Sequence, residues 1–220
     1  MSRYRAVLLD AYGTLIRLDD PVGRLRRSAA ARLGADVSRT QAVAAIRAEI
    51  EHYAANCQSA RDRASLDALR RDCAAVVMGQ LGLAAGSEPS LAVLSDAIAL
   101  RAYPDAAAAL AMLRRRGLAT AVVSNGDCSL ADALEQNGLS VDVVVDSATA
   151  GAAKPDPRIF QAALARLALA PSQALHVGDS EDTDGDGARA AGIDVVIIDR
   201  GSRPQPGTIA SLDDLEARLA

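Results

Sequence analysis

Aromatic residues are nearly missing from this sequence, which has no Trp, one Phe and four Tyr among 220 residues. A hydrophobic core must therefore be built from aliphatic side chains, and 50% of the residues are of hydrophobic types. Long apolar stretches are missing too, since none approaches the ~18 residues that suggest a membrane span. The first residues lack the apolar segment and cleavage site of a signal peptide. We expect a cytoplasmic protein with no membrane partner.

Cysteine and positive charge are also limited. The three cysteines, Cys57, Cys73 and Cys128, are odd in number and lack metal-ligand spacing, which favours a reduced, cytoplasmic setting. The net charge of −4 gives no electrostatic footprint for a nucleic acid. The short basic clusters at 24–27 and 114–116 are expected to be solvated helix faces. The expected partner is a small anionic substrate, held by a local cation or metal.

Five short apolar runs, rich in β-branched residues, predict buried strands. They are nearly continuous rather than alternating, which is typical of parallel strands buried on both faces. Helical segments separate the last four runs, and Pro157 is placed to begin one of these helices. This alternation predicts an α/β fold with a doubly wound parallel sheet. The runs are RAVLLD (5–10), ATAVVSN (119–125), VDVVVDS (141–147), QALHVGD (173–179) and DVVIIDR (194–200).

The long interval between the first two runs has helical character. Ser38 and Gln41 have the spacing of a capping box, which marks the start of a helix. Val43, Ile46 and Ile50 follow at helical intervals and predict an apolar face on that helix. The interval is too long for a single crossover, so we expect an inserted helical domain rather than one connecting helix.

These observations predict two domains. The sheet domain is expected to consist of 1–15 and 96–220, and the all-helical insert is expected at 16–95. The stretch SRPQPGT (202–208) is expected to be a loop because of its Pro and Gly content.

Polar side chains follow the ends of three predicted strands. Asp10 ends the first run, Ser124 the second and Asp179 the fourth, while Lys154 lies just before a predicted helix. Ligands of open parallel sheets bind beyond the carboxyl ends of the strands. We therefore expect these residues to meet at one edge. His176, inside the fourth run, is expected to be a packed or hydrogen-bonded core residue.

Four motifs in this order resemble those of the haloacid dehalogenase superfamily. They are DAYGTL (10–15), SNG (124–126), KPDPRIF (154–160) and GDSEDTD (178–184), and they extend over the whole sheet domain. The helical insert stands where subfamily IA of this superfamily places its C1-type cap. The resemblance implies a Rossmann-like core and hydrolase activity.

The resemblance also implies a role for each motif residue. Asp10 is implied to be a covalent nucleophile, and Thr14 and Ser124 to hydrogen-bond the transferring group. Lys154 is implied to neutralise the nucleophile and the growing negative charge. Asn125 and Tyr12 are expected to contact the substrate.

A magnesium site is implied as well. Oxygen ligands suit Mg²⁺, which prefers carboxylates, carbonyls and water. The expected ligands are Asp10, the backbone carbonyl of Tyr12, Asp179 and, through water, Asp184.

Two motifs point to different chemistries. Phosphatases of the superfamily carry an acid two positions after the nucleophile, but this chain has Tyr12 there, as the 2-haloacid dehalogenases do. Dehalogenases work without metal and have Ser and Asn where this chain has Asp179 and Glu181. Neighbouring carboxylates repel one another unless a cation lies among them, which favours Mg²⁺ and a phosphoryl group.

The leading hypothesis is therefore a Mg²⁺-dependent, phosphatase-like hydrolase that acts on a small phosphorylated metabolite. A metal-independent 2-haloacid dehalogenase with an ester at Asp10 stays open. So does a weakly active or non-catalytic binding member of the superfamily.

Overall fold

The computed structural model describes residues 3–84, 86–201 and 205–219. The chain forms two compact units, one made of Met1–Arg17 and Ala102–Ala220 and the other of Leu18–Arg101. The expected insert boundaries, 16 and 95, fall inside β2 (Ile16–Leu18) and α4 (Ser87–Ala97), respectively. β2 pairs with β3 (Leu100–Ala102) in a two-stranded sheet. The chain passes from one unit to the other through these two strands.

The first unit, called the core unit below, contains a five-stranded sheet in the order β5-β4-β1-β6-β7. All its neighbouring strands are parallel, so the predicted doubly wound α/β sheet is confirmed. Each of the five predicted runs contains one of these strands. β1 lies in the middle, where Leu9 is in register with Val122 on one side and Val177 on the other. The strands are β1 Ala6–Leu9, β4 Ala119–Ser124, β5 Val143–Asp146, β6 Ala174–Gly178 and β7 Asp194–Ile197.

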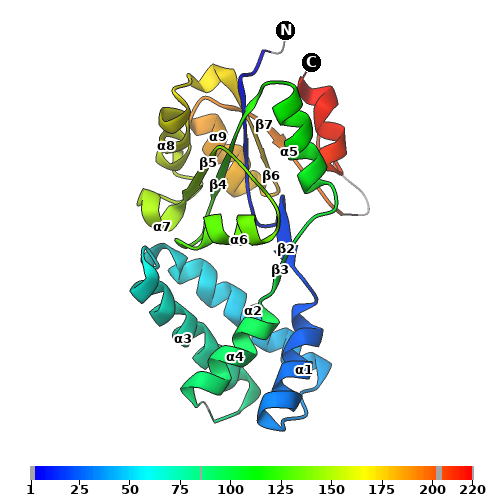
Figure 1. The fold of residues 1–220 in the computed structure, drawn as a ribbon, viewed down its shortest axis with the longest axis vertical. Helices are drawn as coiled ribbons and strands as arrows, with labels where there is room; N and C mark the ends of the chain where they lie inside the picture. Colours follow the sequence, from blue (N-terminus) through cyan, green and yellow to red (C-terminus); the bar gives the residue numbers. More distant parts are fainter. Residues whose placement is uncertain (1–2, 85, 202–204, 220) are drawn as a thin grey trace. The chain divides into compact units, whose positions relative to one another are not determined.

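Helices cover both faces of this sheet (Figure 1). Side chains at alternate strand positions, such as Ala6 and Leu8, pack with residues of α8 (Pro157–Leu167) and α9 (Asp186–Ala190). The only Phe, Phe160, is fully buried in this cluster, and its replacement by Ala is expected to cost about 3–5 kcal/mol. α5 (Ala106–Arg115) lies on the opposite face (Figure 1).

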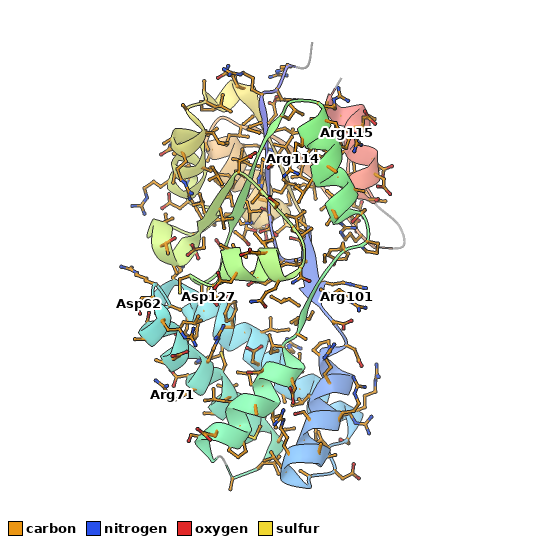
Figure 2. The ribbon with its side chains drawn as sticks, viewed as in Figure 1. Asp62, Arg71, Arg101, Arg114, Arg115 and Asp127 are labelled. Atoms are coloured by element: carbon orange, nitrogen blue, oxygen red, sulfur yellow. The ribbon has the colours of Figure 1, made fainter. Side chains whose placement is uncertain are left out.

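Local signals in the core unit agree with the structure. Pro157 is the first residue of α8, and the Asp156 side chain caps the helix by accepting a hydrogen bond from the Arg158 backbone. Arg114 and Arg115 are exposed at the end of α5, as expected for a solvated basic cluster (Figure 2). The remaining helical segments of this unit are α6 Leu130–Gln136, α7 Ser147–Ala150, η2 Pro171–Gln173, η3 Glu181–Gly185 and η4 Leu212–Leu219.

The second unit, called the helical unit below, has helices α1 to α4 as its main elements. The predicted capping box is present: Ser38 Oγ accepts from the Gln41 backbone N–H at 3.2 Å, and Gln41 Oε1 accepts from the Ser38 backbone N–H at 3.1 Å. The helical segments are α1 Pro21–Leu33, α2 Arg39–Asn56, η1 Cys57–Ser59, α3 Arg63–Leu81 and α4 Ser87–Ala97.

The apolar face predicted on α2 is partly wrong. Ile46 is buried, but Val43 and Ile50 are 46% and 45% exposed. The inward face of α2 carries Ala42, Ala45, Ile46 and Glu49 instead. α2 packs on α3, and the small alanines allow close contact there, so two of the three predicted apolar residues lie outside the buried face. None of the described helices combines the length and apolar character that crossing a bilayer requires.

The predicted loop at 202–208 lies partly outside the described residues, which omit 202–204.

Candidate active site

A tight turn follows β1 and places Asp10 at the centre of the sheet edge. The Ala11 carbonyl accepts hydrogen bonds from the backbone N–H groups of Leu15 at 2.8 Å and Ile16 at 2.9 Å. Gly13 has a positive φ of 84°, and a Cβ at this position would lie 2.0 Å from Asp179 Oδ2. Glycine is therefore required for the turn and for the close approach of the Asp179 carboxylate.

Two donors from different segments meet at Asp10, which is only 4% exposed. Ser124 Oγ, at the end of β4, donates to Asp10 Oδ1 at 2.8 Å. Lys154 Nζ donates to the same oxygen at 2.5 Å. Burial raises the pKa of Asp10, Lys154 opposes this effect, and the charge of Asp184 adds to it. Among the described residues, no donor contacts Asp10 Oδ2, which leaves this oxygen available for chemistry.

Lys154 is the only lysine in the sequence, and it serves two carboxylates at once. Besides Asp10, its Nζ contacts Asp184 Oδ1 at 2.6 Å. Burial acts to lower the pKa of Lys154, but the charges of Asp10 and Asp184 outweigh it and hold the pKa above its usual value. The ammonium therefore stays charged between the two acids. The ammonium is compact, so one nitrogen atom reaches both carboxylates. An arginine would present separate nitrogen atoms of a planar guanidinium instead.

Asn125 holds the backbone of Lys154. Its Nδ2 donates to the Lys154 carbonyl at 3.0 Å, and its Oδ1 accepts from the Lys154 backbone N–H at 2.7 Å. The predicted contact of Asn125 with the substrate stays a prediction, and in the structure its amide bonds the Lys154 backbone. The amide ties the segment after β4 to the segment that carries the lysine.

Three carboxylates come together beside Lys154. One ligand oxygen from each of Asp10, Asp179 and Asp184 lies within 4.8 Å of the others. Partial burial of its carboxyl, followed by the charges of Asp10 and Asp184, raises the pKa of Asp179 to about 6. Mutual repulsion of this kind is relieved by a divalent cation, and carboxylate oxygens are the ligands that Mg²⁺ takes. The donor set therefore fits the implied metal.

Asp184 reaches this cluster through an unusual turn after β6. Residues Glu181–Gly185 form one π-helical turn, a feature that is frequent at functional sites. The Asp184 side chain lies against Gly178, where an added Cβ would come within 2.1 Å of Asp184 Cγ. His176 Nε2 hydrogen-bonds Asp184 Oδ1 at 2.7 Å. Burial acts to raise the pKa of Asp184, but the His176 hydrogen bond and the Lys154 charge lower it to about 2.

Thr14 and Tyr12 lie in the turn that follows Asp10. The Thr14 hydroxyl is buried and has no hydrogen-bond partner among the described residues. Tyr12 is partly buried and forms an isolated bridge with Ile16. Their implied roles toward the substrate stay predictions, as do the catalytic and metal-binding roles of the other motif residues.

Arg200 stabilises this turn, although the sequence indicated no role for it. It donates to the Thr14 carbonyl at 2.7 Å and to both carboxylate oxygens of Asp105 at 2.9 and 3.1 Å. Its guanidinium carbon lies 3.8 Å from the centre of the Tyr103 ring. A cavity of about 570 Å³ reaches both Gly13 and Asp179 next to this arginine. Arg200 follows the last strand and belongs to none of the four motifs, so no sequence signal marked it.

Asp127 is an acid next to the second motif that takes part in local hydrogen bonds. It lies between β4 and α6 (Figure 2), and its Oδ1 accepts hydrogen bonds from Ser129. Arrangements of this kind are typical of turns.

Comparisons with known proteins agree with the motifs. A family model described as haloacid dehalogenase-like hydrolase matches residues 4–192. The chain is 45% identical over 106 residues to a phosphoserine phosphatase from Thermus thermophilus, which covers 47% of this chain and 43% of that protein. It is 38% identical over 114 residues to (S)-2-haloacid dehalogenase 1 from a Pseudomonas species, which covers 50% of each. The matched segments therefore span about half the length of these relatives.

The fold agrees as well. The crystal structure of a HAD phosphatase from Thermococcus onnurineus matches with a TM-score of 0.66 and 25% identity over 98% of both chains. Phosphatases and dehalogenases thus both occur among the similar proteins. Together with the family model, which matches most of the chain, these findings show that the chain belongs to the haloacid dehalogenase-like hydrolase family.

Proposed function

We propose that the chain is a Mg²⁺-dependent, phosphatase-like hydrolase that cleaves a small phosphorylated metabolite through an aspartyl-phosphate at Asp10. The observation that carries this proposal is the cluster of Asp10, Asp179 and Asp184, whose ligand atoms lie within 4.8 Å of one another. The phosphatases among the similar proteins support it. The reduced state expected of the cysteines supports a cytoplasmic setting.

The charges of the cluster favour a cation and an anionic substrate together. Three carboxylates face one ammonium, Lys154, so the site is left with excess negative charge. Asp10, Asp179 and the Tyr12 carbonyl would hold Mg²⁺, with Asp184 acting through water. The metal would neutralise negative charge on the carboxylates and on the phosphoryl oxygens.

The proposed reaction has two steps. Asp10 Oδ2 attacks the phosphorus atom, since Oδ1 already accepts from Ser124 and Lys154. The bond from phosphorus to the leaving oxygen breaks, and its electron pair stays on that oxygen. Water then attacks the phosphorus, releases phosphate and restores the Asp10 carboxylate. Lys154 and Ser124 stabilise the charge that develops in both steps.

Tyr12 limits which leaving groups are accepted. A carboxylic acid at this position would protonate the leaving oxygen, an effect worth about 10²–10⁴-fold in rate. Tyr12 supplies no such acid, so aryl phosphates are expected to react much faster than alkyl phosphates. Replacing Tyr12 by Asp should raise the rate on alkyl phosphates by about tenfold or more. Tyr12→Asn is the matched control without an acid, and an equal gain in both variants would contradict this role.

Dehalogenation is the second candidate, and Tyr12 is the observation that favours it. The similar (S)-2-haloacid dehalogenase 1 adds support. Halide leaves without a proton, so a tyrosine at this position is compatible with that reaction. Against it stands the excess negative charge at the cluster, which would repel a carboxylate substrate in the absence of metal.

A substrate panel tests the proposal. Aryl phosphates, alkyl phosphates and 2-chloropropionate are each assayed with Mg²⁺ and with a chelator, and Asp10→Asn serves as the inactive control. We expect phosphate release that requires Mg²⁺ and Asp10. Halide release in chelator, with no phosphatase activity, would overturn the proposal in favour of dehalogenation.

Isotope labelling separates the two reactions independently. In a single turnover in water enriched in the heavy oxygen isotope, attack at phosphorus puts the label in phosphate. Hydrolysis of an ester at its carbonyl carbon puts the label in the Asp10 carboxylate instead. Mass spectrometry of the released phosphate reads out the first position, and mass spectrometry of the peptide that contains Asp10 reads out the second.

A further inference from the structure

His176 is a polar residue in an otherwise apolar strand. Its neighbours in β6, Leu175 and Val177, are 2% and 0% exposed, and His176 itself is fully buried. The ring of Phe160 packs against the His176 ring, with 4.9 Å between the two ring centres and an interplanar angle of 86°. An apolar side chain would fill this space without burying polar atoms, so packing alone does not explain a histidine here.

All the hydrogen bonding of His176 is directed at one carboxylate. Nε2 contacts Asp184 Oδ1 at 2.7 Å, whereas Nδ1 is buried and has no hydrogen-bond partner among the described residues. An ionised carboxylate can only accept, so the proton in this contact belongs to Nε2. The protein leaves one ring nitrogen unsatisfied and uses the other to hold Asp184.

The strand geometry makes this contact possible. Residues two apart in a strand point to the same face, so His176 and Gly178 share one face of β6. Gly178 has no side chain, and the Asp184 carboxyl lies over it, 2.1 Å from where a Cβ would be. The carboxylate can therefore lie flat along the strand end and reach the histidine. Glycine makes the space and histidine supplies the donor.

Three segments fix the orientation of the Asp184 carboxylate. Oδ1 accepts from His176 and from Lys154 Nζ at 2.6 Å, and Oδ2 accepts from the Ser180 backbone N–H at 3.2 Å. Lys154 is shared with Asp10, so it cannot fix Asp184 alone. Among the described side chains that donate to Asp184, His176 is the one that contacts none of the other acids of the cluster.

We propose that His176 is a positioning residue that orients Asp184 for Mg²⁺ through the Nε2 hydrogen bond. This inference rests on the proposed metal site. Groups behind a metal-binding carboxylate typically contribute about 10-fold to 100-fold to metal affinity when they orient it. Among the described residues, the His176 side chain hydrogen-bonds Asp184 and neither Asp10 nor Asp179, so its effect passes through Asp184.

Two amide substitutions test the position of the donor. In His176→Gln the amide nitrogen falls near the place of Nε2, and in His176→Asn it falls near the place of Nδ1, away from Asp184. Mg²⁺ binding is measured by isothermal titration calorimetry on the full chain, with no substrate present. His52→Leu is the matched control, since His52 is the other of the two histidines and lies on α2.

We expect His176→Asn to weaken Mg²⁺ binding about 10-fold to 100-fold, His176→Gln to bind within a few-fold of the wild type, and His52→Leu to leave binding unchanged. Thermal unfolding without Mg²⁺ establishes that each variant is folded. Equal affinities of folded His176→Gln and His176→Asn would overturn the inference. If His176→Asn does not fold, wild-type-like binding by His176→Gln supports the inference, and a 10-fold or greater loss in folded His176→Gln overturns it.

Asp179→Asn distinguishes a failure of the proposed metal site from a failure of the proposed role of His176. Loss of Mg²⁺ binding in Asp179→Asn, together with equal binding by the two His176 variants, would contradict the role of His176 and leave the metal site standing. Absence of Mg²⁺ binding by the wild type, or equal binding after Asp179→Asn, would overturn the metal site and the role of His176 together.

Discussion

The core unit and the helical unit each bury acids, but they treat them differently. In the core unit, Asp10 and Asp184 are 4% and 1% exposed and receive donors from Lys154, Ser124 and His176. In the helical unit, Glu49 is also 4% exposed, and its described partner is the weak thiol donor of Cys73. Burial raises the pKa of both Asp10 and Glu49, but the Lys154 charge and the hydrogen bonds of Lys154 and Ser124 oppose this effect at Asp10, whereas Cys73 alone opposes it at Glu49.

The two units differ in the number of donors that surround each buried acid. A buried carboxylate that stays charged needs several donors or a cation, and strand ends from different parts of the chain supply them. A buried carboxyl with one weak donor is held more readily in its neutral form. Buried acids with several donors at the strand ends are therefore candidates for chemistry, and the buried acid of α2 is not.

Removing the Lys154 ammonium from the core unit should have the largest effect. Lys154→Met leaves Asp10 and Asp184 without their shared ammonium, and turnover should fall by about 10²–10³-fold. Stability without Mg²⁺ should fall by about 3–5 kcal/mol at neutral pH, because two buried charges lose their partner. Lys154→Arg keeps the charge but not the compact ammonium. Wild-type turnover in Lys154→Met, measured under saturating substrate, would contradict the account.

Lowering the pH should weaken metal binding through Asp179. Its pKa is raised from 3.8 to about 6, so its carboxyl gains a proton as the pH falls through 6. A metal ligand must be ionised, so Mg²⁺ affinity should fall by up to about tenfold per pH unit below 6. In the metal-free protein the sign is opposite: ionising Asp179 is harder when folded, so its contribution to stability falls as pH rises from about 4 to about 6.

Calorimetric titrations with Mg²⁺ from pH 5 to pH 8 measure this dependence. Asp179→Asn should bind Mg²⁺ weakly at every pH and lose the part of the dependence that is due to this group. A constant affinity of the wild type across the range would show that Asp179 is not a ligand.

Asn125→Ala should have a smaller effect on turnover. The change removes two hydrogen bonds to the Lys154 backbone, each worth about 1 kcal/mol, and we expect about a tenfold loss of kcat. Asn137→Ala is the matched control, because the Asn137 amide also bonds two backbone groups, at 2.8 and 2.9 Å. Both variants should lose similar stability, and only Asn125→Ala should lose turnover. Equal turnover in the two variants would argue that Asn125 has a purely structural role.

The smallest effect is expected in the helical unit. The pKa of Glu49 is raised above 4.5, so its ionisation destabilises the folded protein, and stability is lost as pH rises from 4.5 through the higher folded pKa. Glu49→Gln should remove this loss and stabilise the protein by about 1 kcal/mol above that range. Glu51→Gln is the control, since Glu51 is exposed and pairs with Arg47. Denaturant unfolding at several pH values measures the difference, and identical pH profiles of wild type and Glu49→Gln would contradict it.

Much of the core fold could be predicted because its signals are local. Five apolar runs each contain a strand of the sheet, although the last of these strands, β7, is half-buried rather than buried. Pro157 with Asp156 marks the start of α8. The pair β2 and β3 escaped prediction because three-residue strands carry no periodicity. The buried face of α2 escaped as well, since close packing there favours Ala42 and Ala45 over the larger Val43 and Ile50.

The site was predictable to the extent that its residues end strands or belong to motifs. Asp10, Ser124 and Asp179 meet at one edge because parallel strands end there. The partners of the motif residues were not predictable. Arg200 reaches the Thr14 carbonyl across 186 positions of sequence, and no local pattern encodes such a contact. The hydrogen bond from the Asn125 amide to the Lys154 carbonyl likewise joins two segments that are far apart in the sequence.

The central claim is that Asp10 becomes covalently bonded to the group that is transferred. Rapid acid quenching during turnover of an aryl phosphate with Mg²⁺, followed by peptide mass spectrometry, tests it most directly. We predict a phosphoryl group on the peptide that contains Asp10, absent from Asp10→Asn and increased in amount when hydrolysis of the intermediate is slow. Efficient turnover with no modification of that peptide at any quench time would contradict the account.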